Sequence, residues 1–263
     1  MKLGFIGSGN MAKAMMRGII KSGLLPADEI MASDLSTASL EATKTSLNVN
    51  VTNDNLSVAA CDTVVLSVKP QYYADVIHQI APYVKENTLI VTIAPGMTME
   101  KVCRLFGREI KLVRTMPNTP AMVGEGMTAA CANQKVTSEE MDYVCSLLRG
   151  FGKCAVVSES MMDAVVAISG SSPAYVDMMI EALADGAVME GMPRALAYQF
   201  AAQAVLGSAK MVLETGKHPA ELKDMVCSPA GTTIEAVRVL EEKGFRSSLI
   251  EAVNACVQKA RSM

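Results

Sequence analysis

A glycine-rich turn near the start of the chain has the residue types that bind a pyrophosphate. The segment Gly7-Ser8-Gly9-Asn10-Met11-Ala12 reads G-x-G-x-x-A and follows the apolar run that ends at Ile6. In this pattern the first glycine permits a tight turn, the second lets the backbone approach the pyrophosphate, and the last small residue keeps the next helix close to the sheet. The first amides of that helix face the phosphates. The turn, with Ile6, therefore predicts a dinucleotide-binding site.

The end of the second predicted strand has side chains that can reach the adenosine ribose. Ser33 and Asp34 close the run 30–34. A carboxylate at this place usually binds the ribose 2′-hydroxyl of NAD, whereas the 2′-phosphate of NADP needs a cation or a hydroxyl. Asp34 favours NAD on this argument, while Ser33 and Asn55 can donate hydrogen bonds to a phosphate. A role of Asp34 as a turn or cap residue stays open.

Two further strand ends supply candidate cofactor contacts. Ligands bind outside the carboxyl ends of the strands in open α/β sheets. The runs 63–68 and 88–93 end there in the predicted contacts Ser67, Val68, Lys69, Pro70, Ile93, Ala94 and Pro95. The segment 116–120 follows the next strand, and its proline and small residues suit a loop against a flat ring.

A hydroxyl-rich segment in the second half of the chain could bind a carboxylate. Ser228-Pro229-Ala230-Gly231-Thr232-Thr233 joins two predicted helices. Its hydroxyls and the free amides at the start of the next helix form an anion cradle. A plain turn between helices would not need so many hydroxyls, although that interpretation stays open. The segment 169–175, with Pro173 near the first turn, predicts another helix start.

The elements that must position these residues alternate between strand and helix in the first half of the chain. Short apolar runs predict strands at 3–6, 30–32, 49–52, 63–68, 88–93, 112–115 and 154–157. Helical spacing lies between most of them, and Thr137 with Glu140 forms a capping box that opens a helix closed by Gly150. This alternation predicts a doubly wound parallel sheet of the Rossmann type in a dinucleotide-binding domain, residues 1–157.

After Ser158 the strand signals vanish. Helices are predicted at 173–190, 194–215, 232–243 and 246–260, and glycines at 191, 216 and 244 separate them. Small residues lie on the faces of the first two helices and allow close packing. An all-helical domain this apolar is expected to pack against a second copy of itself. We therefore predict a substrate-binding and dimerisation domain over residues 158–263.

Composition excludes several classes of protein. Hydrophobic residues make up 50% of the 263 residues and charged residues 19%, so the chain can form a core. The formal net charge of −3 argues against a duplex-binding protein, and the aromatic content of 4% without tryptophan argues against a stacking platform for single strands. Seven cysteines without C-x-x-C spacing predict reduced thiols in a cytoplasmic protein, and the two histidines form no metal-ligand pattern. No signal peptide or apolar run long enough to span a membrane is expected.

Along essentially its whole length the chain resembles the pyrroline-5-carboxylate reductase family. The matching segments are 7–12, 68–70, 118–120, 170–175 and 224–233 with Phe245 and Arg246, although Ala230 stands where the family usually has glycine. The resemblance implies hydride transfer from NAD(P)H to the cyclic imine 1-pyrroline-5-carboxylate, which gives L-proline in the last step of proline biosynthesis. It also implies NADP as cofactor, leaving NAD open, no metal, no nucleic acid or membrane partner, and a homodimer or higher homo-oligomer.

The substrate of that reaction has one carboxylate and one imine nitrogen, so it needs an anion cradle and a hydrogen-bond partner for nitrogen. The resemblance assigns these roles to Ser171, Ser228, Ala230, Gly231, Thr232 and Thr233. Thr233 is the candidate catalytic residue, because its hydroxyl can hydrogen-bond to the nitrogen. Positioning against the nicotinamide would supply most of the rate enhancement.

Two other classes stay open from the residues alone. A β-hydroxyacid dehydrogenase shares the glycine turn and a helical second domain, but it places a catalytic lysine in the helix after the interdomain loop. The range 173–190 contains no lysine. A non-catalytic dinucleotide-sensing protein would bind the cofactor without a substrate pocket, and it leaves the hydroxyls of 228–233 unexplained.

Overall fold

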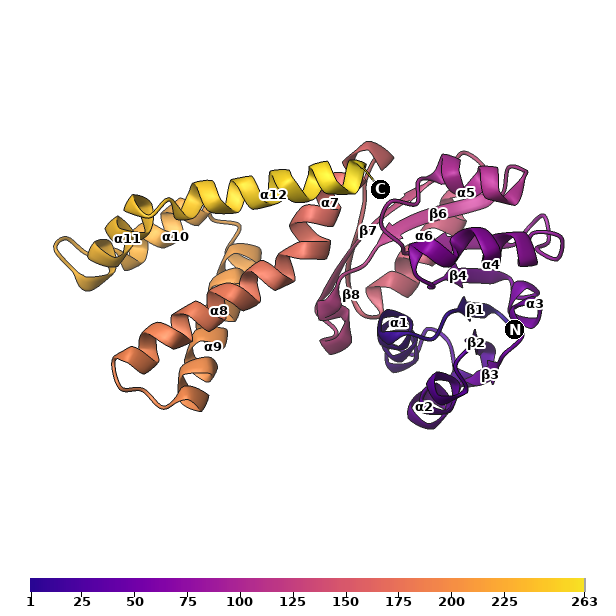
Figure 1. Ribbon diagram of the computed structural model, residues 1–263, viewed down its shortest axis with the longest axis horizontal. Helices are drawn as coiled ribbons and strands as arrows, with labels where there is room; N and C mark the ends of the chain where they lie inside the picture. The colour runs from indigo at the N-terminus through magenta and orange to yellow at the C-terminus, as the bar shows by residue number, and fades with distance from the viewer. Residues whose placement is uncertain (263) are drawn as a thin grey trace. The chain divides into compact units, whose positions relative to one another are not determined.

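The computed structural model describes residues 1–262 and contains one eight-stranded sheet with the order β3-β2-β1-β4-β5-β6-β7-β8 (Figure 1). The strands are β1 (Leu3–Ile6), β2 (Ile30–Ser33), β3 (Asn50–Thr52), β4 (Thr63–Leu66), β5 (Leu89–Thr92), β6 (Lys111–Met116), β7 (Gly126–Ala132) and β8 (Gly152–Val156). Neighbouring strands from β3 to β6 pair in parallel, with Leu3 opposite both Ile30 and Thr63. The doubly wound sheet is confirmed.

The strand β7 was not predicted from the sequence, and it changes the sheet from fully parallel to mixed. β7 pairs antiparallel with β6, and β8 pairs parallel with β7. Its sequence GMTAACA has few of the β-branched and aromatic residues that mark strands. Packing between two neighbouring strands, which buries Thr128 and Ala130 completely, decides its conformation instead.

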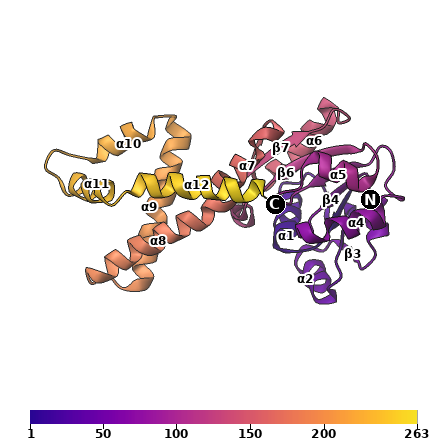
Figure 2. The same ribbon diagram turned by 45° about the horizontal axis from the view of Figure 1, so that its top comes forward.

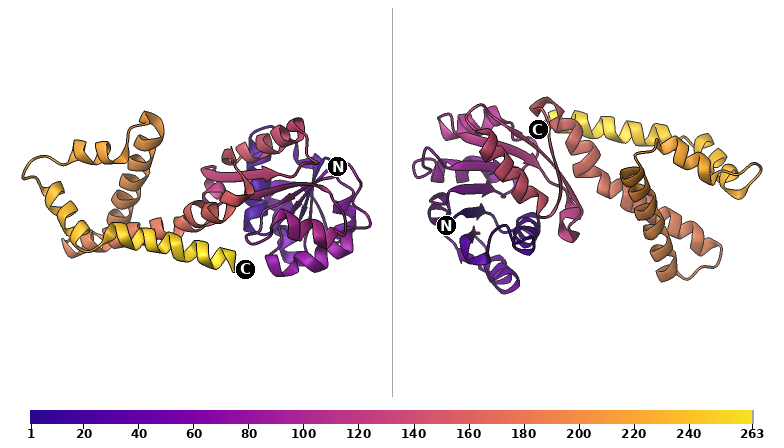
Figure 3. Two further views of the ribbon diagram at one scale, coloured as in Figure 1. Left: turned by 90° about the horizontal axis from the view of Figure 1, so that it is seen from above. Right: turned by 180° about the vertical axis from the view of Figure 1, so that it is seen from behind.

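Helices cover both faces of the sheet, as Figure 3 shows. They are α1 (Asn10–Lys21), α2 (Thr37–Leu47), α3 (Asn55–Ala59), α4 (Tyr73–Ile80), α5 (Met99–Phe106) and α6 (Ser138–Arg149). One face packs against α1, α2 and α6 around Phe5 and Met15, and the other packs against α3, α4 and α5 around Leu66 and Ile77. The two layers hold the carboxyl ends of the parallel strands in fixed register.

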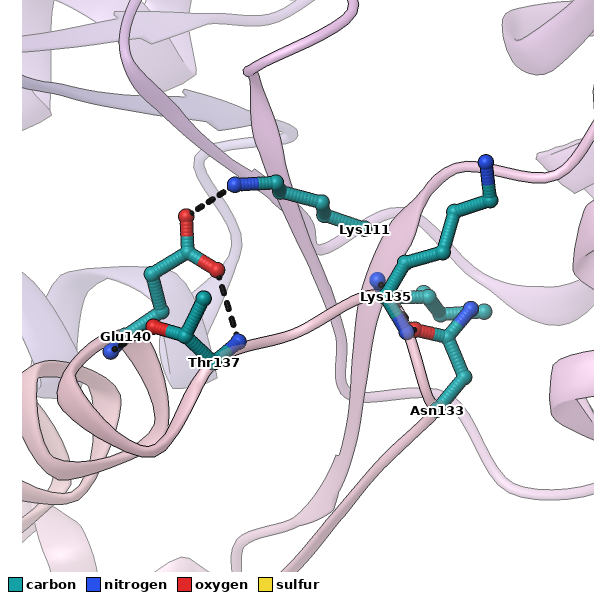
Figure 4. A network of polar contacts seen from close by, with 6 residues as sticks. Lys111, Asn133, Lys135, Thr137 and Glu140 are labelled. Carbon is teal, nitrogen blue, oxygen red and sulfur yellow. Dashed lines mark hydrogen bonds and ion pairs between the residues drawn. The ribbon is translucent and has the colours of Figure 1, made fainter.

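The predicted capping box of α6 is confirmed, and Figure 4 shows it. The Thr137 hydroxyl accepts a hydrogen bond from the Glu140 amide at 3.2 Å, and Glu140 Oε2 accepts one from the Thr137 amide at 2.9 Å. The other carboxylate oxygen of Glu140 pairs with Lys111 at the start of β6. This ion pair therefore connects α6 to the amino-terminal end of β6. The predicted site lies at the opposite, carboxyl-terminal ends of the strands.

The α-helix α8 (Ser172–Met189) begins inside the predicted segment 169–175, but helical backbone that was not predicted precedes it. α7 (Met162–Val165) leads into a π-helical segment, Val166–Ser171, and this leads into α8. Pro173 therefore follows a π segment. A wider turn accommodates a residue that has no amide hydrogen to donate.

The remaining helices are α9 (Arg194–Thr215), α10 (Pro219–Val226), α11 (Thr232–Glu242) and α12 (Phe245–Arg261). α9, α11 and α12 are close to the predicted ranges, whereas α10 had no predicted range. Gly191, Gly216 and Gly244 separate them with left-handed backbone. The chain forms two compact units, residues 1–171 with 256–263 and residues 172–255. These bounds differ from the functional division predicted at 157/158, which stays a prediction. In the helical unit α8 packs against α9 (Figure 2).

Among residues 1–262, no helix is both long enough and apolar enough to cross a membrane.

Candidate functional site

The glycine turn after β1 has the geometry that a pyrophosphate requires. Gly7 has φ +99°, and a Cβ there would lie 2.8 Å from the carbonyl oxygen of Ser67, so a side chain at this position would clash with the backbone. Gly9 has φ −69° and ends the turn as the N-cap of α1. A Cβ on Gly9 would meet no atom within 4 Å. The space beside Gly9 is therefore open to a ligand, which fits a dinucleotide.

Asp34 holds the glycine turn from the end of β2. Its Oδ2 accepts hydrogen bonds from the Ser8 amide at 2.8 Å and from the Ser8 hydroxyl at 3.1 Å, and its Oδ1 accepts one from the Ser36 amide at 2.9 Å. Asp34 therefore has the role of a turn residue that the sequence left open. Asp34 also lines a cavity beside the turn, and its contact with the ribose stays a prediction.

A chain of hydrogen bonds orients Asn55 at the end of the sheet. The buried Ser33 hydroxyl donates to Asn55 Oδ1 at 2.7 Å, and Asn55 Nδ2 donates to Gln79 Oε1 at 2.8 Å. Ser33 therefore acts on the cavity through Asn55, which lines it, because Ser33 itself is fully buried.

The turn after β4 is braced by two hydroxyls. The Ser67 hydroxyl contacts the carbonyl oxygens of Ile6 at 3.0 Å and Gly7 at 2.7 Å, which fixes the turn against the glycine turn. The Tyr73 hydroxyl donates to the Leu66 carbonyl at 2.7 Å. Burial raises the pKa of Tyr73 far above its usual value, so the phenol keeps the proton that it donates.

Two cavities lie at this edge and share Ser67, Val68 and Lys69. The first, of about 590 Å³, is lined by Ile6, Gly7, Gly9, Asp34, Leu35, Ser36, Asn55, Ser67, Val68, Lys69, Tyr72, Asp75, Val76 and Gln79. The second, of about 310 Å³, is lined by Met11, Ser67, Val68, Lys69, Pro70, Ile93, Ala94, Pro95, Met116, Pro117, Asn118, Thr119 and Gly170. The glycine turn thus stands beside one cavity and the nonpolar strand ends beside the other.

Most of the predicted cofactor residues line one of these cavities. The exceptions are Ser8, Asn10, Ala12 and Ser33, of which Ser8, Ala12 and Ser33 are buried and Asn10 is exposed. One face of the segment from Tyr72 through α4 was not predicted to belong to the site. Tyr72, Asp75, Val76 and Gln79 line the first cavity with the spacing i, i+3, i+4 and i+7, which is a helical face. That spacing was the signal available in the sequence.

The second cavity offers little acid–base chemistry. Lys69 is the one charged side chain among its lining residues within the described chain. A site of this composition can hold two reactants in a fixed geometry and exclude water from them. Such a site suits a transfer that depends on positioning more than on a strong base.

The segment 228–233 forms a tight turn in the helical unit. The Gly231 amide donates to the Ser228 carbonyl at 3.1 Å, and a Cβ on Gly231 would lie 2.4 Å from the Ser228 hydroxyl oxygen. Gly231 is the N-cap of α11, and no side chain caps that helix. The first amides of α11 and the hydroxyls of Ser228, Thr232 and Thr233 therefore lie within one short stretch of chain.

Ala230 has a left-handed backbone with φ +56°. This conformation costs a residue with a Cβ about 1–2 kcal/mol. We expect Ala230→Gly to raise the free energy of unfolding by about 1 kcal/mol in chemical denaturation. The matched control is Ala209→Gly on an exposed position of α9, which should lower it by about 0.5–1 kcal/mol. An unchanged or lower stability of the Ala230→Gly variant would contradict the view that the backbone of Ala230 is strained.

Ser171, the remaining predicted substrate contact, ends the π-helical segment. Its hydroxyl oxygen lies 3.3 Å from Cys256 Sγ near the end of α12. The structure therefore places Ser171 in the same compact unit as the cavities and the segment 228–233 in the other unit.

Comparison with known proteins identifies the family. Residues 159–263 match the family model described as pyrroline-5-carboxylate reductase dimerisation, and residues 2–96 match the model of NADP oxidoreductase, coenzyme F420-dependent. The pyrroline-5-carboxylate reductase of Escherichia coli (strain K12) is 49% identical over 263 residues, covering 100% of this chain and 98% of the relative. This chain belongs to the pyrroline-5-carboxylate reductase family.

Solved structures of this family have the same fold. The pyrroline-5-carboxylate reductase of Coxiella burnetii is 34% identical, with a TM-score of 0.92 over 99% of this chain and 97% of that chain. The Plasmodium falciparum enzyme, solved with NADP bound, is 33% identical, with a TM-score of 0.91 over 99% of this chain and 97% of that chain. The sequence alone had left a β-hydroxyacid dehydrogenase open as an alternative. Membership of the reductase family excludes that alternative.

Proposed function

We propose that the chain reduces 1-pyrroline-5-carboxylate to L-proline with NAD(P)H, the last step of proline biosynthesis. The observation that carries the proposal is the pair of neighbouring cavities at the carboxyl edge of the sheet, which share three lining residues, in a chain of this reductase family. The first cavity suits the adenosine and pyrophosphate, because the glycine turn borders it. The second suits the nicotinamide ring and the substrate, since its lining is mostly nonpolar.

The substrate carboxylate is assigned to the segment 228–233 with Ser171. Free helix amides and hydroxyls are suited to an anion, and α11 begins without a side-chain cap. Thr233 is the proposed partner of the ring nitrogen. These assignments rest on the residue chemistry and on the resemblance described above.

The reaction converts a protonated imine to a secondary amine. The cofactor, when bound, supplies a hydride from its nicotinamide ring to the imine carbon, and the electron pair of the C=N bond goes to nitrogen. The Thr233 hydroxyl would hydrogen-bond to that nitrogen and orient the ring. Nonpolar residues such as Met116 and Pro117 would exclude water from the transfer.

A homodimer or higher homo-oligomer belongs to the same proposal. The helical unit buries three residues almost completely, namely Ala184, Ala197 and Ala201. Large apolar side chains such as Phe200 and Leu213 are exposed at 61% and 84%. A unit with so small a core of its own is expected to bury this surface against a second copy, and the match to a dimerisation model supports this. The cytoplasm is the proposed compartment, since the described cysteines are unpaired thiols.

A spectrophotometric assay tests the function. NADPH or NADH oxidation is followed with racemic 1-pyrroline-5-carboxylate, and 3-hydroxyisobutyrate with the oxidised cofactor serves as the control for a dehydrogenase. We expect oxidation that depends on the imine and no turnover of the hydroxy acid. Cofactor binding without turnover would instead support a dinucleotide-sensing protein.

Cofactor preference depends on Asp34 in this proposal. We expect Asp34→Ser to raise the ratio of kcat/KM for NADPH over NADH by about 10-fold, because a negative charge beside a 2′-phosphate is removed. Asp75→Asn, which removes the other acid lining the first cavity, is the comparison. A ratio that does not move in Asp34→Ser would mean that Asp34 only holds the Ser8 and Ser36 amides.

A further inference from the structure

Three hydrogen bonds join Asn118, Met127 and Ser169 in a closed ring. Asn118 Oδ1 accepts from the Met127 amide at 2.8 Å. Asn118 Nδ2 donates to the Ser169 hydroxyl at 3.2 Å, and the Ser169 hydroxyl donates to the Met127 carbonyl at 3.1 Å. The ring therefore ties the end of β6, the start of β7 and the π-helical segment together.

A fourth bond explains why an amide stands at position 118. In an α-helix the carbonyl of Ser169 would accept from the amide of residue 173, but that residue is Pro173 and has no amide hydrogen. Asn118 Nδ2 donates to this carbonyl at 3.2 Å. Asn118 thus donates to a carbonyl whose α-helical partner Pro173 cannot provide, next to the point where the helix changes from π to α.

The ring forms part of the wall of the second cavity. Asn118 and Gly170 both line it, and Asn118 is almost buried, with 9% of its surface exposed. A Cβ on Gly170 would lie 2.7 Å from Met116 Cε, so the π segment packs closely on the end of β6. A shift of the segment 168–171 would therefore change the shape of this cavity.

We propose that Asn118 is a positioning residue of the reductase, which holds the π segment, and with it the lining residue Gly170, at the distance that hydride transfer requires. The inference rests on the proposed function, because it takes the second cavity as the place of the transfer. Asn118 acts through Ser169 and the Met127 backbone. Since a displacement of about 1 Å can cost about 100-fold in rate, loss of the ring should appear in the chemical step.

The test is Asn118→Asp, which keeps the acceptor for the Met127 amide and removes the donor to Ser169. We expect kcat to fall by at least about 10-fold. We expect the Kd of ADP-ribose, which has no nicotinamide, to stay within about twofold, and the primary isotope effect with 4-deuterated cofactor to rise as hydride transfer becomes rate-limiting. A normal kcat and isotope effect would overturn the inference.

Asn133→Asp is the matched control at the opposite end of the same pair of strands. Asn133 Oδ1 accepts from the Leu112 amide at 3.3 Å and Nδ2 donates to the Ile110 carbonyl at 2.8 Å. Figure 4 shows Asn133 beside Lys135, and Asn133 does not line the second cavity. We expect this variant to lose stability and keep kcat within about twofold. Equal losses of kcat in both variants would mean a purely structural role for Asn118.

Two further measurements keep the outcomes distinct. If Asn118→Asp does not fold, Ser169→Ala removes only the hydroxyl from the ring and should lower kcat in the same direction with ADP-ribose binding unchanged. Hydrogen exchange at residues 166–171 should be faster in either variant, and unchanged exchange would contradict the ring as the brace. An inactive wild-type enzyme would contradict the proposed function, whereas an active wild type with a fully active Asn118→Asp contradicts this inference alone.

Discussion

Gly9→Val is expected to lower the affinity for NADPH by about 100-fold or more while the fold stays intact. Gly9 lines the first cavity, and a Cβ there would meet no protein atom within 4 Å. Its φ of −69° is open to any residue, so valine adds no backbone strain. The branched side chain would instead occupy the space that the pyrophosphate needs. Cofactor titration by fluorescence, together with circular dichroism, measures both parts of the prediction.

Two comparison variants separate cofactor exclusion from misfolding. Gly9→Ala adds one methyl group and should lose less affinity than the valine variant. Gly7→Ala should lose stability, because its Cβ would lie 2.8 Å from the Ser67 carbonyl oxygen at a φ of +99°. Normal NADPH affinity in a folded Gly9→Val protein would remove the glycine turn from the cofactor site.

Thr233→Ala is expected to lower kcat by up to about 100-fold with little change in NADPH affinity. The Thr233 hydroxyl is the proposed partner of the ring nitrogen, and help of this kind from a neutral hydroxyl is worth about 100-fold at most. Thr233→Ser keeps the hydroxyl and should retain most of the activity. Steady-state kinetics on the two variants, with thermal melts, provide the measurement.

The alternative role of Thr233 is to cap α11. The structure gives the N-cap position to Gly231, and no side-chain hydrogen bond caps the helix. A capping role would make Thr233→Ala lose about 1 kcal/mol of stability with an unchanged kcat. A normal turnover in that variant would therefore contradict the catalytic assignment.

Most of the lining of the two cavities was predictable from the sequence as a candidate cofactor site, because these residues follow strands whose periodicity is clear. Gly7, Ser67 and Ile93 each stand at a strand end, and parallel strands bring those ends to one edge. What the pattern could not give was the partner of each side chain. These partners depend on tertiary geometry. Examples are the bond from the Ser8 amide to Asp34 and the bond from Ser33 to Asn55.

The features that were missed or wrongly predicted are those set by packing. The strand β7 is rich in alanine and has weak strand propensity, so only its place between β6 and β8 makes it a strand. Pro173 is typical of a helix start, and the π segment before it cannot be seen in local sequence. The role of Asn118 follows from that segment, since Asn118 donates to the Ser169 carbonyl, which cannot accept an α-helical bond from Pro173.

Transfer of deuterium from the cofactor is the most direct test of the proposed hydride transfer to 1-pyrroline-5-carboxylate. The wild-type protein is incubated with NADPH carrying deuterium at C4 of the nicotinamide, on each face in turn, and with racemic 1-pyrroline-5-carboxylate. Mass spectrometry and NMR then locate the label in the product. We expect L-proline with one deuterium on the former imine carbon from one of the two labelled cofactors. Cofactor oxidation without labelled proline, or no oxidation at all, would contradict it.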